Sequence, residues 1–273
     1  MSAAPPASPV DPELIAARRW YHTIELPGGI VTPGEYDLRG ALSRVPLPAS
    51  LAGRRCLDVG THDGFWAFEM ERRGAEEVVA IDLDDLAAYD WPLPVPALTD
   101  EARTANAERL ESFRIAHAAL GSSVQRRFLS VYDLSPEAVG RFDFAVIGTL
   151  LLHLRDPSRA LSAIAGVLEG ELLVNDVISL SLTVLRPRTP AAKLMGVPGS
   201  PFWWALNLAG LRRLIISAGF EIVRSGRPYL VANGTGSEPW AVGRRHALAS
   251  VTRQALLLVG APHAWVLARP RPA

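Results

Sequence analysis

The sequence predicts an α/β fold in which helices lie on both faces of a doubly wound, parallel, seven-stranded sheet. The first observation that predicts this fold is that apolar runs of strand length alternate with helical patterns from residue 54 to residue 270. The second is a glycine turn directly after the first apolar run, which leads into a helix. The third is size: 273 residues, 49% of them hydrophobic, can form one large domain with a sizeable core.

The elements follow from hydrophobic periodicity and from glycine, proline and capping residues. Near-continuous apolar runs are typical of strands buried on both faces, and we expect them at residues 54–60, 77–85, 123–134, 142–154, 171–180, 221–225 and 262–270. Helical patterns, with Thr99 and Asn207 as N-caps, Pro157 at a helix start and glycines after the helix ends, predict helices over 64–74, 99–121, 157–170, 207–220 and 245–260.

The domain organisation follows from composition. Residues 1–14 are rich in proline and alanine and are expected to be disordered, and residues 15–50 mix aromatic residues, glycine and proline as in an irregular N-terminal lobe or flap. Residues 51–273 form the main domain, with proline-rich insertions at 87–98 and 179–206.

Composition narrows the function classes. The net charge is zero, but the residues after Leu211 include nine arginines and only two glutamates, so this region is basic. It is either a surface that binds an anion such as tRNA or the result of an arginine-biased composition. Cys56 is the sole cysteine and is expected inside a strand. The sequence shows neither a signal-peptide pattern nor an apolar run that would span a bilayer, so a cytoplasmic location without a membrane partner is expected.

The turn LDVGTHDG indicates a nucleotide site of a particular kind. A dinucleotide fingerprint needs glycine at its first, third and sixth positions, and counting from Gly60 this chain has His62 and Phe65 at the later two. A pyrophosphate would meet an imidazole there, which argues against NAD or FAD. The spacing Asp58-x-Gly60-x-x-x-Gly64 instead suits a ligand without a diphosphate.

Asp82 stands at the end of the second predicted strand, 18 positions after Gly64. A carboxylate there can accept hydrogen bonds from two ribose hydroxyls. The alternative is an ordinary strand-end acid beside Asp84 and Asp85. This acidic trio has no matching histidine, so no metal site is expected.

These residues resemble the class I S-adenosylmethionine-dependent methyltransferases, which have a Rossmann-like seven-stranded sheet. Within residues 20–178, the chain is similar to the branch of the tRNA wobble-uridine carboxymethyltransferases and its bacterial relatives, through HTIELPGGIVTPGEYD, LDVGTHDGFWAFEMERRGAEEVVAIDLDD, VYDL and GRFDFAVIGTLLLHLRDPSRAL. The resemblance implies S-adenosyl-L-methionine as cofactor. It places the cofactor on Asp58, Gly60, Thr61, His62, Gly64, Asp82, Leu83, Tyr132, Asp133, Leu134, Gly148, Thr149 and Leu150.

The chain departs from that branch where the transferred group is chosen. The wobble-uridine enzymes carry a Tyr-His pair where this chain has Leu152 and His153, and their Trp- and Lys-rich segment is here PGEYDLRGALSRV. Ordinary methyl transfer is therefore favoured over carboxymethyl transfer. The preferred reading is a methyltransferase acting on a small molecule, plausible in specialised metabolism, with a tRNA-modifying enzyme and a cofactor-binding protein without methyl transfer as alternatives.

Candidate catalytic and acceptor residues come from three regions. His153 follows the fourth predicted strand and is either a general base for the acceptor or a structural histidine. His22 and Tyr36 belong to the N-terminal lobe, which is expected to close over the cofactor. Trp203 and Trp204, with Asn207 beside them, either form an acceptor wall or pack the core.

Overall fold

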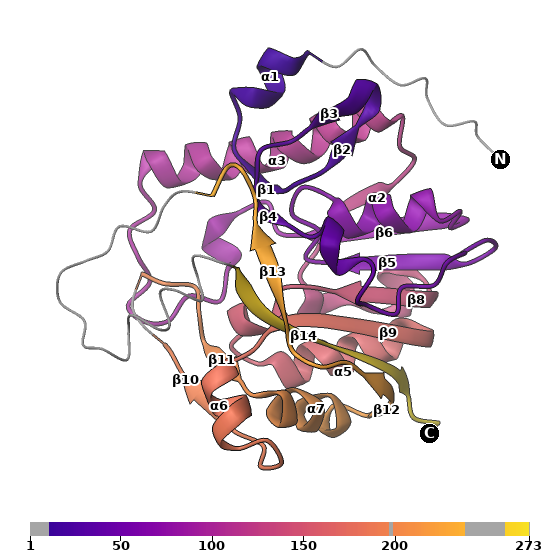
Figure 1. The fold of residues 1–273 in the computed structure, drawn as a ribbon, viewed down its shortest axis with the longest axis vertical. Coiled ribbons are helices and arrows are strands. Elements are labelled where there is room, and N and C mark those ends of the chain that lie inside the picture. The colour runs from indigo at the N-terminus through magenta and orange to yellow at the C-terminus, as the bar shows by residue number, and fades with distance from the viewer. Residues whose placement is uncertain (1–10, 197–198, 238–259, 273) are drawn as a thin grey trace.

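The computed structural model describes residues 11–196, 199–237 and 260–272, and it confirms a mixed α/β fold built on one large sheet (Figure 1). The seven predicted strands are all present. Six are neighbours in the order β7 (Gln125–Phe128), β6 (Glu77–Asp82), β5 (Arg55–Val59), β8 (Phe142–Ile147), β9 (Leu168–Val177) and β14 (Ala261–Pro270), and β12 (Phe220–Ser225) pairs with β14.

Strand direction differs from the prediction at β14. The first five strands of this order are parallel, but β14 runs antiparallel to both β9 and β12. The order reverses at β5, which has β6 on one side and β8 on the other. Ligands of open α/β sheets bind beyond the carboxyl ends of strands at such a reversal, so the turn after β5 lies at the expected place.

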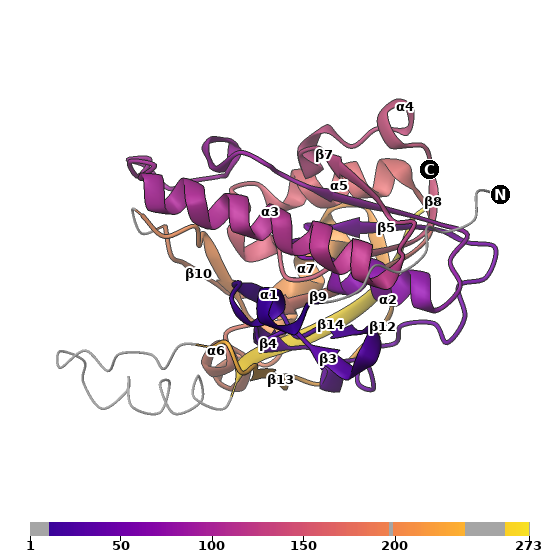
Figure 2. The ribbon, with the colours of Figure 1, turned by 90° about the horizontal axis from the view of Figure 1, so that it is seen from above.

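Alternate residues of each strand pack into different cores on the two faces of the sheet. Cys56 belongs to the core beneath α2 (Phe65–Arg72) and α3 (Asp100–Leu120), whereas the neighbouring Leu57 belongs to the other core. That second core is covered by α4 (Pro136–Val139), α5 (Pro157–Val167) and α7 (Leu208–Ser217). Figure 1 shows α2 and α3 above the sheet and α5 and α7 below it, and in Figure 2, seen from above, α3 lies in front. Burial on both faces explains why the central strands lack a polar alternation.

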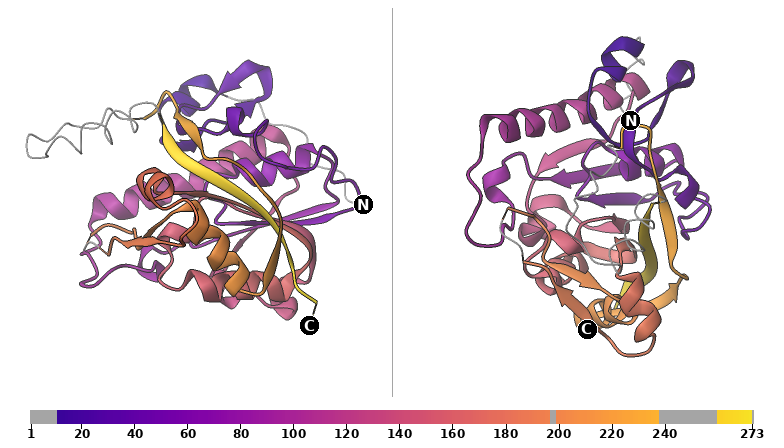
Figure 3. Two further views of the ribbon diagram at one scale, coloured as in Figure 1. Left: turned by 60° about the horizontal axis from the view of Figure 1, so that its bottom comes forward. Right: turned by 60° about the vertical axis from the view of Figure 1, so that its left-hand side comes forward.

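The N-terminal segment adds strands to the main sheet. Its strands β1 (Trp20–His22) and β4 (Gly34–Asp37) pair with each other, and β4 pairs with β13 (Tyr229–Asn233), which pairs with β14. The sheet therefore has ten strands, and it runs from β7 at one end to β1 at the other. Figure 3 shows the long yellow β14 crossing the sheet toward these strands. Between β1 and β4, the short strands β2 (Glu25–Leu26) and β3 (Ile30–Val31) form a hairpin.

The expected N-terminal disorder is wrong for the described residues before Ile15. Helix α1 (Pro12–Ala16) begins there because the Asp11 side chain accepts a hydrogen bond from the Glu13 N–H and Pro12 occupies the first helical position. Ile15 is buried, and its carbonyl accepts the indole N–H of Trp20 at 2.9 Å. Residues 1–10 lie outside the described residues.

The two predicted insertions are present in different forms. The first begins with the short 3-10 helix η3 (Leu86–Ala88) and continues without regular structure to Thr99. The second contains α6 (Leu180–Leu185) and an antiparallel hairpin of β10 (Ala192–Leu194) and β11 (Trp204–Leu206). The helix expected over 245–260 falls outside the described residues, save for its last position.

Candidate functional site

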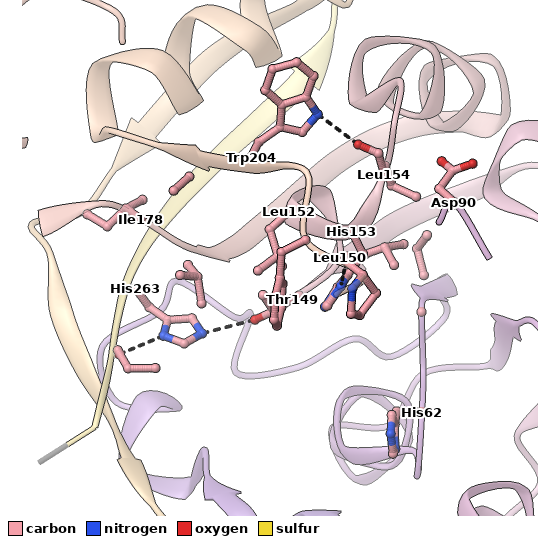
Figure 4. Close-up of a pocket in the computed structure, with 18 of the residues that line it drawn as sticks. His62, Asp90, Thr149, Leu150, Leu152, His153, Leu154, Ile178, Trp204 and His263 are labelled. Carbon is pink, nitrogen blue, oxygen red and sulfur yellow. Dashed lines mark hydrogen bonds between the residues drawn. The ribbon is translucent and has the colours of Figure 1, made fainter. Parts of the chain in front are cut away.

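A cavity of about 1090 Å³ lies at the carboxyl ends of β5, β6 and β8. Its walls come from the turns after these strands, from the N-terminal strands β1 and β4, and from the second insertion with α6, β10 and β11. Figure 4 shows part of this wall, with Thr149, Leu150, Leu152 and His153 between Trp204 and His62. Within the described residues, no group of three His, Cys, Asp or Glu side chains is placed to hold a metal ion.

The turn after β5 has one glycine in the cavity wall and one beneath it. Gly60 lines the cavity with a φ of +78°, and a Cβ there would meet the Leu150 side chain at 3.2 Å. Gly64, with a φ of +99°, leads into α2, where a Cβ would meet the Phe68 ring at 2.3 Å. Both positions require glycine because L side chains rarely adopt this conformation.

Asp58, Thr61 and Gly64 do not line the cavity, although direct cofactor contact was expected of them. Asp58 is buried below the turn and accepts the Ala67 N–H of α2 at 3.1 Å. Burial raises the pKa of Asp58 to about 7. Asp58 on β5, with Thr61 and Gly64 in the turn that follows, is buried and supports the turn from below the cavity wall.

Asp82 is held by three donors. Its Oδ2 accepts the His62 N–H at 2.9 Å and Nη1 of Arg109 at 2.5 Å, and its Oδ1 accepts the Leu83 N–H at 2.8 Å. Asp82, Leu83 and Arg109 all line the cavity. A carboxylate has about four acceptor positions, so one remains for a ligand rather than the two expected. Arg109, which sequence reasoning missed, comes from α3, 27 residues further along the chain.

His62 and the N-terminal strand form an aromatic wall. The His62 ring stacks on Tyr21 with a centroid distance of 4.4 Å, and Tyr21 meets Tyr36 edge-on at 5.1 Å. Burial lowers the pKa of His62 to about 3, so its imidazole is neutral, and its buried Nδ1 has no hydrogen-bond partner among the described residues. His62 is thus part of the wall rather than a solvent-facing loop residue.

His22 and Tyr36 line the same cavity, as expected of an N-terminal cover. The position of His22 depends on Asp63, a fully buried carboxylate that sequence reasoning missed. Nδ1 of His22 lies against Oδ1 of Asp63, and Oδ2 accepts the backbone N–H of His22 at 2.8 Å and that of Tyr21 at 2.9 Å. One acid in the β5 turn therefore fixes β1 over the cavity.

The predicted adenine edge is displaced along the chain. Leu129, Ser130, Val131 and Tyr132 line the cavity, whereas Asp133 is exposed and Leu134 packs into the core. The displacement arises because β7 ends at Phe128 and the chain turns at once into the 3-10 helix η4 (Val131–Asp133). The Tyr132 hydroxyl donates to Oδ2 of Asp90 at 2.5 Å, so the first insertion is tied to this edge.

The turn after β8 lines the cavity as predicted, with Gly148, Thr149 and Leu150. The Gly148 carbonyl accepts the indole N–H of the buried Trp66 at 3.1 Å. The buried carboxylate of Asp176 accepts the backbone N–H groups of Leu150 at 3.2 Å and Leu151 at 2.8 Å. Burial raises the pKa of Asp176 to about 7.

Two histidines lie beside this turn. His153 lines the cavity and donates Nδ1–H to the Pro201 carbonyl at 2.8 Å, and burial lowers its pKa. His263 was missed by sequence reasoning because it comes from β14; its Nδ1–H donates to Ala261 O at 2.9 Å and its Nε2 accepts the Thr149 hydroxyl at 3.1 Å (Figure 4). Burial lowers the pKa of His263 to about 4, so both rings are neutral near pH 7.

Of the three predicted acceptor residues, only Trp204 lines the cavity. Its indole N–H donates to the Leu154 carbonyl at 3.0 Å (Figure 4). Trp203 instead donates to the Asp90 carbonyl at 2.5 Å. Asn207 is buried as the N-cap of α7, with its amide also bonded to the Arg186 and Thr189 carbonyls, so the acceptor role expected of it is wrong.

The fold and the cavity beyond the strand reversal define a Rossmann-like α/β protein with a candidate ligand site at the carboxyl ends of its central strands. A family model described as "Methyltransferase domain" matches residues 34–225, and the chain belongs to this family. Membership confirms the predicted class, the S-adenosylmethionine-dependent methyltransferases of the Rossmann-like fold.

Relatives of established name are similar over part of their length. A ubiquinone biosynthesis O-methyltransferase of Xanthomonas euvesicatoria is 33% identical over 163 residues, 59% of this chain and 55% of that protein. A tRNA U34 carboxymethyltransferase of Pseudomonas paraeruginosa is 27% identical over 200 residues, 72% of this chain and 54% of that protein. The chain thus spans about half the length of these relatives.

Solved structures agree on the fold. The N-terminal domain of EvdMO1, crystallised with SAH and D-fucose, has a TM-score of 0.50 at 17% identity, covering 95% of this chain and 94% of that one. A putative methyltransferase of Haloferax volcanii, in complex with the Trm112 activator, also has a TM-score of 0.50, at 13% identity and covering 86% and 89% of the two chains. Among the described residues, no helix is both long and apolar enough to cross a membrane.

Proposed function

We propose that this protein transfers the methyl group of S-adenosylmethionine to a small-molecule acceptor bound in the same cavity. The observation that carries the proposal is the cavity itself, which continues from the turns after β5 and β6 to α6 and β11. Ligand pockets of proteins measure about 300–1,000 Å³, and this cavity, at about 1090 Å³, is large enough for two molecules side by side.

The residues at the sheet end of the cavity fit the cofactor. Gly60 leaves open the space that a Cβ would fill, and Asp82 offers a carboxylate position toward a ribose. Tyr132 and Val131 supply the wall next to an adenine, and Gly148 to Leu150 supply the wall next to the sulfonium. When bound, S-adenosylmethionine supplies an activated methyl group, and the protein's part is to align the acceptor with it.

His153 is the residue we assign to the acceptor's proton. Its Nδ1 carries the hydrogen that is donated to Pro201 O, so the unprotonated nitrogen of the neutral ring is Nε2. As the acceptor oxygen or nitrogen forms its bond to the methyl carbon, its proton passes to Nε2 and from there to water. The test is transfer of a labelled methyl group to a panel of phenols, carboxylates and amines, with His153→Gln as the comparison.

Binding of the demethylated product, S-adenosylhomocysteine, gives the more direct test of the site. Calorimetry is expected to show one binding site per chain. The proposal would be overturned if neither S-adenosylmethionine nor S-adenosylhomocysteine bound and if Asp82→Ala behaved like the unaltered protein.

A second candidate is modification of tRNA, favoured by the similarity to the U34 carboxymethyltransferase. Such an enzyme would bind tRNA through its basic C-terminal third, with an affinity that falls steeply as salt increases. Absence of tRNA retention at low salt would exclude this candidate and leave the small-molecule acceptor.

A further inference from the structure

The cavity has a second end, formed by the insertion after β9, whose chemistry differs from that of the cofactor end. Leu180, Ser181, Val184 and Leu185 line it from α6, at spacings that place them on one side of a helix. Val184 is 70% exposed and Leu185 is 77% exposed, so these apolar side chains face open space. The molecule thus presents an apolar surface that no described segment covers.

The hairpin of β10 and β11 provides the facing wall. Lys193 pairs with Ala205 in the antiparallel register, so these two side chains lie on the same face of the hairpin, and Met195 follows two positions after Lys193. All three residues line the cavity. The hairpin is held next to the β8 turn because the Trp203 N–H donates to the Leu152 carbonyl at 2.8 Å.

Lys193 is the sole lysine of the chain, is exposed, and lines the cavity together with Glu35, Asp82, Asp90 and Arg109. Arg109 and Asp82 pair with each other, and Asp90 accepts the Tyr132 hydroxyl and the Arg155 N–H. No ion pair joins Lys193 to any carboxylate among the described residues.

The sequence around Lys193 gives no acid to neutralise it. Between Asp176 and Glu221 the chain contains no aspartate or glutamate, but it does contain four arginines besides Lys193. The acceptor end of the cavity therefore joins apolar walls to an exposed lysine that has no ion pair among the described residues. A neutral acceptor would leave this ammonium solvated and a cationic one would be repelled by it, whereas an anionic group would pair with it.

We propose that the acceptor is an apolar, ring-containing molecule that bears an anionic group, and that Lys193 selects it by pairing with that group. The ring would lie between α6 and the Phe202–Trp204 edge of the hairpin, with the anion toward Lys193. This inference rests on the proposed function, since it names the substrate class of the same cavity. Lys193 acts on binding and takes no part in the transfer of the methyl group.

The test uses two probes of nearly equal shape, 2-naphthoate and the uncharged 2-naphthamide, titrated by calorimetry into protein saturated with S-adenosylhomocysteine. An ion pair at a partly open site contributes about 1 kcal/mol or less, so we expect naphthoate to bind about threefold to fivefold more tightly. Lys193→Gln should reduce this ratio to about one, and Lys193→Arg should preserve it. Higher salt should reduce the ratio for the unaltered protein.

Arg188→Gln is the matched control, because Arg188 is exposed in the same insertion and does not line the cavity. It removes the same charge and should leave the ratio unchanged. Equal binding of the two probes, binding of neither, a ratio that survives in Lys193→Gln, or an equal loss in Arg188→Gln would each overturn the inference. Because S-adenosylhomocysteine is titrated first, its failure to bind would count against the proposed function, whereas failure of the probes alone would count only against the acceptor class.

Discussion

Replacement of Asp82 by alanine is expected to lower both the affinity for the cofactor and the stability of the protein, since this carboxylate serves both. Three of its roughly four acceptor positions are filled by the N–H groups of His62 and Leu83 and by Arg109. The remaining position allows one charge-assisted hydrogen bond to a ribose hydroxyl, worth about 1.5–3 kcal/mol. Asp82→Ala is therefore expected to weaken binding of S-adenosylhomocysteine by about 10-fold to 150-fold.

The same change leaves the guanidinium of Arg109 without its ion pair, with a side chain that is only 9% exposed. Removing one partner of a buried pair costs about 3–5 kcal/mol, and the residual exposure of both groups favours the lower end. For a chain of this size, about 3 kcal/mol corresponds to a fall of about 6–12 °C in the melting temperature. Adding Arg109→Leu should recover most of that stability without restoring affinity.

The assay combines calorimetry with S-adenosylhomocysteine and thermal melting of each variant. Asp84→Ala is the control, because Asp84 is an exposed acid two positions further along the chain. It should match the unaltered protein in both measurements. Unchanged affinity in Asp82→Ala, or an equal loss in Asp84→Ala, would refute the assignment of Asp82 to the ribose.

Three further changes test other parts of the site. His153→Gln is expected to lower kcat by about 100-fold or more. Because burial lowers the pKa of His153, its ring stays a neutral base below pH 6.5, and activity falls only as pH drops through that lowered pKa. If the kcat–pH profile of the variant kept the same acid limb, the assignment would be contradicted. Gly60→Ala adds a Cβ at 3.2 Å from Leu150 and about 1–2 kcal/mol of backbone strain, so both the melting temperature and the affinity for S-adenosylhomocysteine should fall. Unchanged affinity would exclude Gly60 from the ligand surface. Asn207→Ala removes an N-cap and buried hydrogen bonds, and it should lower the free energy of unfolding in urea by about 2–4 kcal/mol while the affinity of the folded protein for the cofactor stays constant. A loss of affinity without loss of stability would support a contact between Asn207 and the ligand.

The sequence predicts features that lie within one strand–turn–helix unit better than features that join distant units. The Gly60 turn and Asp82 were placed correctly because two neighbouring parallel strands end at the same edge of the sheet. His263 and Lys193 were missed because their place at the cavity depends on pairings across the fold, of β14 with β9 and of β10 with β11. No local periodicity records such pairings.

The adenine edge and Asn207 show a second limit. An apolar stretch that continues past a strand end looks the same in sequence whether it extends the strand or turns. After β7 the chain turns, because the Ser130 side chain caps η4 by accepting the Tyr132 N–H. Asn207 is predicted both as a helix cap and as an acceptor contact. The structure shows that the cap uses its amide fully.

The pairing of β14 has a consequence for the order in which the molecule assembles. β1 and β4 reach the rest of the sheet through β13, and β13 is attached through β14, which follows the other strands of this sheet along the chain. Strands β5 to β9 can pair while the chain is still being synthesised, but the part of the cavity wall that β14 supplies, with His263, must wait for residues 261–263. Such long-range closure is slow. A nascent chain would therefore carry an open, unfinished cavity until β14 docks.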